Sequence, residues 1–245
     1  MKITDAFWEK RNLGVSCKEI IIEDNDKTES LRELKQMQNS TEYLVIKAPP
    51  NRIDIYAILS TLGFSFIESS INLIIDVKNA RLSQIEERIN NSISYQEVSE
   101  SGLGVIYNEI KNGIFNTDRI AVDSFFTAHQ ASNRYINWIK DEVKKGANVY
   151  EMVLGDKNIG FTAFKSTGDR TYYAFLGGLY KDYLSSGLGF IVIRKPIEEA
   201  IKRGGGIFDS YVSSNNLSML NIHINQGFKI NQISNVFIWH KEDCI

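Results

Sequence analysis

The sequence has little cysteine, histidine or proline, and its charges almost cancel. Its 245 residues include two cysteines, Cys17 and Cys244, three histidines, His129, His223 and His240, and three prolines. Two distant cysteines and three scattered histidines give neither a disulfide framework nor a zinc cluster, so we expect no metal centre. The 28 Lys and Arg residues against 30 Asp and Glu residues leave a net charge of -2. This balance argues against a nucleic-acid partner, because nucleic-acid-binding proteins concentrate basic charge.

Long apolar runs are also missing. No stretch approaches the ~20 apolar residues of a membrane-spanning helix, and residues 1–10 lack the apolar segment of a signal peptide. Hydrophobic residues make up 43% and charged residues 24% of the chain, as is usual for globular proteins. We therefore expect a cytoplasmic globular protein without a membrane partner. The length allows one large domain or two small ones, and the polar, glycine-containing stretch 96–120 suggests a boundary between 1–110 and 111–245.

The first half alternates strand and helix patterns. β-Branched runs predict strands at residues 19–23 and 43–47. Apolar residues at helical spacing predict a helix over residues 55–62, and Gly63 fits the left-handed residue that ends a helix. The apolar stretch 64–77 predicts one or two further strands.

The second half begins with an amphipathic helix predicted over residues 130–145. A strand pair with a hairpin signal follows it. The expected order is then strands at 150–154, 158–164 and 171–179, a glycine-containing loop at 184–189, a helix ending at 203, a strand at 207–212, a helix at 217–225 and an extended segment at 228–240. This order indicates the α/β class.

One tract of each half has the same pattern. Asn51 lies twelve positions before Gly63-Phe64, and Asn215 lies twelve positions before Gly227-Phe228. Each Gly-Phe pair follows a predicted helix and precedes a predicted strand. Two explanations stay open: an internal duplication, or the common use of glycine to end a helix.

A loop of serines and glycines, Ser185-Ser186-Gly187-Leu188-Gly189, lies between a predicted strand and a predicted helix. The first N–H groups of a helix have no internal partner, and glycines let the backbone approach an anion closely. The loop is therefore a candidate diphosphate-binding site. It lacks the third glycine of a dinucleotide fingerprint and the Lys-Ser/Thr pair of a nucleotide P-loop, and close packing alone also accounts for such turns.

Two segments together resemble the signatures of the Gcn5-related N-acetyltransferases (GNAT). Residues 179–189, LYKDYLSSGLG, resemble the acyl-CoA loop with its Gln/Arg-x-x-Gly-x-Gly/Ala core. Residues 216–228, NLSMLNIHINQGF, resemble the second signature, Asn-x-x-Ala-x-x-x-Tyr-x-x-x-Gly-Phe. Two positions depart from these patterns: Leu184 replaces Gln or Arg, and His223 replaces a general-acid Tyr.

This resemblance implies a mixed, mostly antiparallel sheet flanked by helices, in the α/β (α+β) class. It also implies acetyl-CoA as the acyl donor, with no metal. For the Asn of the second signature, capping of the helix is an alternative to contact with the cofactor. The donor-binding residues that the resemblance implies are Gly177, Leu179, Leu184, Ser185, Ser186, Gly187, Leu188, Gly189, Asn216 and His223.

Three further segments, 8–15, 62–68 and 134–139, resemble the dTDP-fucosamine N-acetyltransferases. This implies a smaller N-terminal half with a partial GNAT fold. It also implies an acceptor that is the 4-amino group of a nucleotide-linked 4-amino-4,6-dideoxy sugar, used in surface-polysaccharide synthesis. Dimers are common in that family, so a homodimer is an expectation. The acceptor-binding residues implied are Asp118, Arg119 and Asp123, for which surface salt bridges are the alternative.

The implied chemistry is direct transfer, in which a neutral amine attacks the thioester and a thiolate leaves. His223, with Tyr180 as a second choice, would protonate the thiolate. An imidazolium is a stronger acid than a thiol, but His223 is mostly neutral at pH 7 unless a neighbour raises its pKa. A histidine hydrogen-bonded at a helix end is the alternative. For the base, Glu151 and a chain of waters both stay open.

The leading hypothesis is an acetyl-CoA-dependent N-acetyltransferase acting on a nucleotide-linked amino sugar. Two alternatives stay open. The acceptor is another small amine or a protein N-terminus, or the protein binds acyl-CoA without catalysis. All three require the amides of residues 185–189 to bind the diphosphate of coenzyme A.

Overall fold

The computed structural model describes residues 1–241, so Cys244 lies outside the described residues. The strands form one ten-stranded sheet in the order β1-β2-β3-β10-β4-β9-β8-β7-β6-β5. The pairs β2–β3 and β8–β9 are parallel, and the other neighbours are antiparallel, which confirms the expected mixed, mostly antiparallel sheet. The strands are β1 (Lys2–Asp5), β2 (Cys17–Ile21), β3 (Tyr43–Ala48), β4 (Ser65–Asp76), β5 (Ile93–Glu97), β6 (Asn148–Leu154), β7 (Lys157–Gly168), β8 (Thr171–Leu179), β9 (Ile207–Ser213) and β10 (Lys229–His240).

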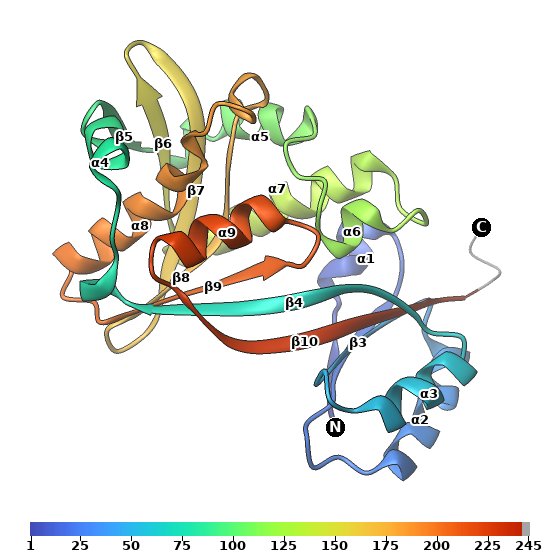
Figure 1. Ribbon diagram of the computed structural model, residues 1–245. Helices are drawn as coiled ribbons and strands as arrows, with labels where there is room; N and C mark the ends of the chain where they lie inside the picture. The colour runs from blue at the N-terminus through green and yellow to red at the C-terminus, as the bar shows by residue number, and fades with distance from the viewer. Residues whose placement is uncertain (242–245) are drawn as a thin grey trace.

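Helices cover both faces of the sheet (Figure 1). On one face, Tyr172 of β8 packs in the same cluster as Ile193 and Ile197 of α8. On the other face, Trp138 of α7 packs against Phe175 of β8, with 5.4 Å between ring centroids. The α-helices of residues 1–241 are α1 (Trp8–Leu13), α2 (Glu33–Ser40), α3 (Ile53–Thr61), α4 (Gln84–Asn91), α5 (Gly104–Lys111), α6 (Arg119–Val122), α7 (Ala128–Lys144), α8 (Ile191–Lys202) and α9 (Leu217–Asn225), and the 3₁₀ helices are η1 (Thr28–Arg32), η2 (Val77–Asn79), η3 (Glu100–Gly102), η4 (Lys181–Tyr183) and η5 (Leu188–Phe190).

The predicted amphipathic helix is confirmed as α7. A capping box begins it: the Thr127 side chain accepts from the Gln130 amide, and the Gln130 side chain accepts from the Thr127 amide. Such reciprocal bonds satisfy amides that have no partner inside the helix. Ala131, Tyr135 and Ile139 of its apolar stripe are buried, so burial of this stripe fixes α7 on the sheet.

The long strands β4 and β10 join the two ends of the molecule (Figure 1). β10 pairs with β3 from Asn235↔Ala48 to His240↔Tyr43 and with β4 along its other edge. β4 in turn pairs with β9. The last strand of each half is therefore inserted beside a strand of the other half. The sheet runs without a break across the boundary expected after residue 110.

The two halves repeat one order of elements. β1–β2–α2–β3–α3–β4 corresponds to β7–β8–α8–β9–α9–β10. The repeated tract of the sequence lies at corresponding places, since α3 and α9 each begin two residues after the repeated asparagine. Gly63 (φ +80) and Gly227 (φ +102) each follow these helices in the left-handed conformation. The correspondence favours the duplication over a chance repeat of glycine caps.

Several short elements differ from the expectation. The sequence pattern did not indicate β1, α1, α2, β5 or α5, which are four to eight residues long. Such short segments show too few periods for a reliable pattern, and neighbouring strands and helices stabilise them instead. Among the helices of residues 1–241, none combines the length and apolar character needed to cross a membrane.

Candidate functional site

The parallel strands β8 and β9 separate along the sheet. They pair from Thr171↔Ile207 to Ala174↔Ser210. Beyond this point β8 continues to Leu179 paired with β7 alone, while β9 continues to Ser213 paired with β4 alone. Beyond this point each strand therefore presents an edge of backbone N–H and C=O groups without a strand partner.

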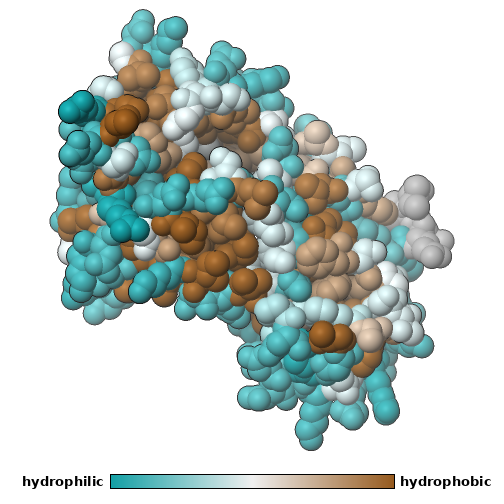
Figure 2. Space-filling view, in the orientation of Figure 1, coloured by the Kyte–Doolittle hydropathy of each residue, from teal (hydrophilic) through white to brown (hydrophobic). Residues whose placement is uncertain are grey.

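A cavity of about 760 Å³ fills this opening and reaches both faces of the sheet. Three predicted donor-binding residues, Gly177, Asn216 and His223, line it. Apolar surface borders the opening over α9 (Figure 2), where Leu217 and Ile224 are exposed. Further lining residues are Val192, Ile193, Ser210 and Met219 on the α8–α9 side, and Phe7, Trp8, Trp138, Tyr173 and Tyr211 on the α7 side.

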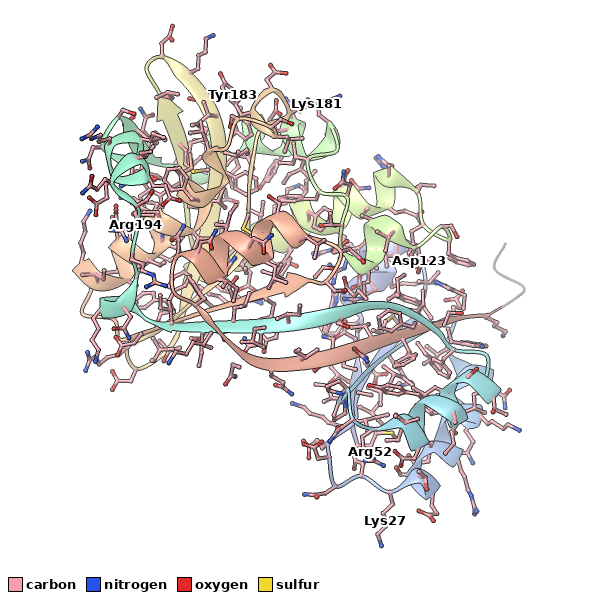
Figure 3. The ribbon with its side chains drawn as sticks, viewed as in Figure 1. Lys27, Arg52, Asp123, Lys181, Tyr183 and Arg194 are labelled. Atoms are coloured by element: carbon pink, nitrogen blue, oxygen red, sulfur yellow. The ribbon has the colours of Figure 1, made fainter. Side chains whose placement is uncertain are left out.

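The predicted diphosphate loop is exposed and lies at the beginning of α8, after Lys181 and Tyr183 in Figure 3. The Ser186 hydroxyl donates to the Tyr183 carbonyl at 2.7 Å and accepts from the Leu188 amide at 3.3 Å. Within residues 1–241, the amides of Ser185 and Gly187 have no backbone acceptor. The loop itself does not line the cavity, but α8, which follows it, does so through Val192 and Ile193.

Glycine is required at three positions of this region, for two different physical reasons. Gly187 has φ +78 with open space beside it, so it sets the turn of the loop. A Cβ on Gly189 would lie 2.7 Å from Ile222, and one on Gly177 would lie 2.8 Å from Val192. These two glycines let α9 and α8 pack closely. Close packing, which the sequence left open as an explanation for the glycines of the 185–189 loop, therefore accounts for Gly189.

His223 lies in the cavity wall as a neutral residue. It is 1% exposed, its Nδ1 lies 2.8 Å from the Met219 carbonyl, and its Nε2 lies 3.1 Å from the Ser210 hydroxyl. A carbonyl can only accept, so Nδ1 carries the proton and Nε2 accepts from Ser210. Burial lowers the pKa of His223 to about 4, although the Met219 bond opposes this. The imidazolium acid considered from the sequence is therefore absent at pH 7, because burial outweighs the Met219 hydrogen bond.

Tyr180, the second candidate acid, does not line the cavity. Its side chain is buried, and its hydroxyl donates to Glu151 at 2.5 Å. Burial and this hydrogen bond raise the pKa of Tyr180 far above its usual range. Tyr180 and the candidate base Glu151 are thus bound to each other, and neither lines the cavity.

Asn216 has the capping role that was the alternative. Its side chain accepts from the Met219 amide at 3.1 Å at the beginning of α9. Since Asn216 also lines the cavity, the cap holds α9 and His223 beside the opening.

The three predicted acceptor-binding residues separate into two places. Asp118 and Arg119 line the cavity. Asp118 caps α6 and accepts from the Tyr135 hydroxyl at 2.5 Å. Asp123, marked in Figure 3, instead bonds His240 at 2.8 Å and lines a second hollow of about 790 Å³. Asp123 is therefore outside the cavity between β8 and β9.

Buried ions from both halves form the α7 end of the cavity. Arg119 lies 2.8 Å from Glu19 and 3.6 Å from Glu9. Arg134 lies 2.8 Å from Glu9, and Lys47 lies 3.7 Å from Glu19. Cations and carboxylates thus neutralise one another. In the part of the chain that the structure describes, no group of three or more His, Cys, Asp or Glu side chains could hold a metal ion.

Sequence reasoning missed most of this ionic wall. Glu9, Glu19, Lys47 and Glu68 are scattered over the first half, and no spacing connects them with residues 118–134. A weak signal existed for Glu9 and Glu68, which lie in the segments 8–15 and 62–68 used for the sugar-enzyme resemblance.

The pKa values of two carboxyl groups near the cavity, those of Glu19 and Glu68, are shifted in opposite directions. For Glu19, burial favours the neutral acid, but Arg119, Lys47 and Arg134 outweigh it and lower the pKa to about 2. For Glu68, burial is the largest influence and raises the pKa, against a hydrogen bond from Ser213. The cations around Glu19 thus stabilise its ionised form, whereas burial destabilises the ionised form of Glu68.

Comparison with known proteins gives the fold. No protein-family model and no curated protein matches the sequence. Solved structures do match. A GCN5-related N-acetyltransferase from Sphaerobacter thermophilus is 8% identical, with a TM-score of 0.58 over 81% of this chain and 60% of that chain. A tandem GNAT protein of the clavulanic acid pathway is 12% identical, with a TM-score of 0.53 over 86% and 68%.

A third similar structure is the GCN5-related glucosamine N-acetyltransferase region of a fungal multi-domain β-N-acetylglucosaminidase. It is 13% identical, with a TM-score of 0.59 over 80% of this chain and 25% of that chain. Identities this low show the fold alone. The chain has the GNAT fold, and one of the similar structures is a tandem GNAT protein.

Proposed function

We propose that this protein is an acetyl-CoA-dependent N-acetyltransferase whose acceptor is the 4-amino group of a nucleotide-linked 4-amino-4,6-dideoxy sugar. The observation that carries the proposal is the opening between β8 and β9. There a single cavity passes from the side of α8 and α9 to a wall of aromatic and ionic side chains. Direct transfer needs such a passage because the donor thioester and the acceptor amine must meet in a fixed geometry.

The donor is assigned to the α8 side of the opening. The diphosphate would lie at the exposed loop 184–189, where the amides of Ser185 and Gly187 are available and the positive end of α8 favours an anion. Leu184 supplies neither a charge nor a side-chain donor, so backbone groups carry this contact. The thioester carbonyl would lie along the free edge of β8 after Ala174, where aligned N–H groups stabilise an oxyanion.

The acceptor is assigned to the α7 side of the cavity. Tyr173 and Tyr211 lie 6.0 Å apart edge to face, and Trp138 is partly buried on the same wall. Such surfaces suit a sugar ring or a nucleobase. Since Glu19 neutralises Arg119, this arginine offers little charge to a phosphate, but its Nε lacks a partner in residues 1–241 and is placed to donate to a hydroxyl. The glucosamine acetyltransferase region supports an amino sugar by analogy.

His223 enters the reaction as a positioning residue in this proposal. A neutral imidazole with Nδ1–H bound to a carbonyl has no proton to give at Nε2. It therefore holds the Ser210 hydroxyl, which lies at the point where β8 and β9 separate. The departing thiolate then takes its proton from the attacked amine or from water.

A second candidate follows from the same observation. Because the predicted acid His223 is neutral and Tyr180 is bound to Glu151, the cavity also fits a module that binds acyl-CoA without transferring the acyl group. Another small amine or a protein N-terminus would fit a catalytic cavity whose acceptor is not a sugar.

One experiment separates these functions. The protein is incubated with acetyl-CoA and, in parallel, with a dTDP-4-amino-4,6-dideoxyhexose, glucosamine, spermidine and a peptide with a free N-terminus. We expect free thiol and the mass of one acetyl group on the 4-amino nitrogen of the nucleotide sugar. Acetylation of another amine alone would reject the sugar assignment. Binding of acetyl-CoA without thiol release from any mixture would support the non-catalytic module.

A further inference from the structure

One carboxyl group of the cavity wall has an unusual environment. Glu68 lies on β4, in the first half of the chain, and lines the cavity. It is 7% exposed, and its Oε2 atom has no hydrogen-bond partner among residues 1–241. A buried polar atom without a partner costs free energy, so it points to a missing partner.

The other carboxylates of the cavity wall already have partners. So does Glu9, which does not line the cavity, although its Oε2 atom also lacks a hydrogen bond among residues 1–241. Each contacts a cation or several hydrogen-bond donors, which stabilise its ionised form. These contacts are Glu9 with Arg134, Glu19 with Arg119, Asp141 with Arg11, Glu142 with Lys165 and Lys145, and Asp118 with the α6 amides and the Tyr135 hydroxyl. Within the described residues, no ion pair involves Glu68.

The sheet register places Glu68 beside the opening. The last β8–β9 pair is Ala174↔Ser210, so Phe175–Gly177 lie across the opening from Tyr211–Ser213. Ser213 is paired with Ser70, two residues from Glu68 on the same face of β4. The Ser213 hydroxyl, which donates to the Thr117 carbonyl at 3.0 Å, also lies near enough to the Glu68 carboxyl to lower its pKa. The carboxyl therefore contacts the strand that borders the free edge of β8.

We propose that Glu68 binds the ammonium group of the acceptor and takes its proton before the nitrogen attacks the thioester. This inference rests on the proposed acetyltransferase function, and it fills the role of base that the sequence left unassigned. The ammonium supplies the partner that the buried carboxylate lacks.

The protonation balance is complete. The ammonium transfers one proton to Glu68, and the neutral nitrogen forms a C–N bond with the acetyl carbon. The C–S bond then breaks, the sulfur takes the second proton of the nitrogen, and the proton on Glu68 leaves to solvent. Burial supports this role because it raises the pKa of Glu68; Asp118 adds to the rise, whereas Ser213, Arg119 and Lys47 oppose it.

The test compares Glu68→Gln with the control Asp209→Asn. Asp209 also has a pKa raised by burial, but it does not line the cavity. We expect Glu68→Gln to lower the rate of acetyl transfer to the dTDP-4-amino-4,6-dideoxyhexose at least about 100-fold, with acetyl-CoA affinity within twofold. Its Tm should rise by about 2 °C or more, because a destabilised charge has been removed. Asp209→Asn should also gain stability but keep the wild-type rate.

Two further readouts exclude a purely structural role. Glu68→Asp should recover part of the rate, and the acid-side decline in the pH profile of kcat/KM should be lost in Glu68→Gln. A Glu68→Gln rate within threefold of wild type would overturn the inference, and so would lost acetyl-CoA binding. If wild-type protein binds acetyl-CoA but releases no thiol with any amine, the proposed function fails and the inference fails with it; an active wild type with an active Glu68→Gln variant rejects the inference alone.

Discussion

The two halves share one order of elements but differ where the parallel strands meet. In the N-terminal half, β2 and β3 pair at all five positions of β2, from Cys17↔Tyr43 to Ile21↔Lys47. In the C-terminal half, β8 and β9 pair at four positions and then separate. Side chains fill the core beside β3, where Leu44 is fully buried, whereas a cavity occupies the opening beside β9.

The loops that follow β2 and β8 also differ. The first contains Glu23, Asp24 and Asp26, and Asp26 already binds the amide of Glu23 and the N-terminal amine. The second, at 184–189, is free of charge and leaves backbone amides available. A cofactor site thus needs both a free strand edge and an anion-compatible loop, and one half has both.

The N-terminal half nevertheless contributes to the site. It supplies β4, which completes the sheet beside β9, and the carboxylates that neutralise Arg119 and Arg134. Because β4 lies between β10 and β9, the N-terminal half forms part of the wall of the cavity in the C-terminal half.

Breaking the ionic contact between the halves should have the largest effect. Arg119→Met leaves Glu19 and Glu9 buried without their shared cation, and we expect a loss of about 3–5 kcal/mol in the free energy of unfolding. Urea unfolding measures it. The control Arg11→Met removes an exposed pair with Asp141 and should cost less than about 1 kcal/mol. Equal costs would show that the buried network does not hold the halves together.

A second comparison concerns the position four residues before each Gly-Phe pair, where His223 corresponds to Leu59. The folded state holds His223 neutral with a pKa of about 4, below the ordinary 6.5. The unfolded chain therefore binds more protons between these values, and stability should fall as pH decreases through this window, by up to about 3 kcal/mol.

His223→Leu gives the C-terminal half the residue of the N-terminal half. The difference in unfolding free energy between wild type and this variant should change between pH 7 and pH 4, in the variant's favour at low pH. A difference independent of pH would mean that His223 is charged or exposed in the folded protein.

The smallest change in free energy is expected for a substitution in the 184–189 loop. Gly187→Glu gives it the acidic character of the N-terminal loop, and repulsion should weaken acetyl-CoA binding about 100-fold, or about 2.7 kcal/mol. Gly155→Glu is the matched control, because Gly155 also has positive φ and open space but lies in the β6–β7 turn. Calorimetry should give one acetyl-CoA per wild-type chain. Unchanged binding by Gly187→Glu would move the diphosphate elsewhere.

Local signals account for what the sequence predicted well. The helical spacing of apolar residues predicts α7, and glycines at the ends of α3 and α9 mark the repeated tract. The resemblance to the acetyltransferase signatures implied Gly177, Asn216 and His223 as donor-binding residues, and all three line the cavity. Short polar elements such as β1 and α2 had no such periodic signal.

The sequence by itself determined the order of strands and helices, the anion-compatible loop and the resemblance to the acetyltransferase fold, because each depends on residues near one another in the chain. The tertiary structure alone decided that His223 is neutral, that Tyr180 is bound to Glu151, and that Glu68 lies in the cavity. Protonation and partnership depend on burial and on which side chains the fold brings together. His223 meets Ser210 and Tyr180 meets Glu151 across neighbouring elements, and β4 brings Glu68 of the first half to a cavity lined by the second half.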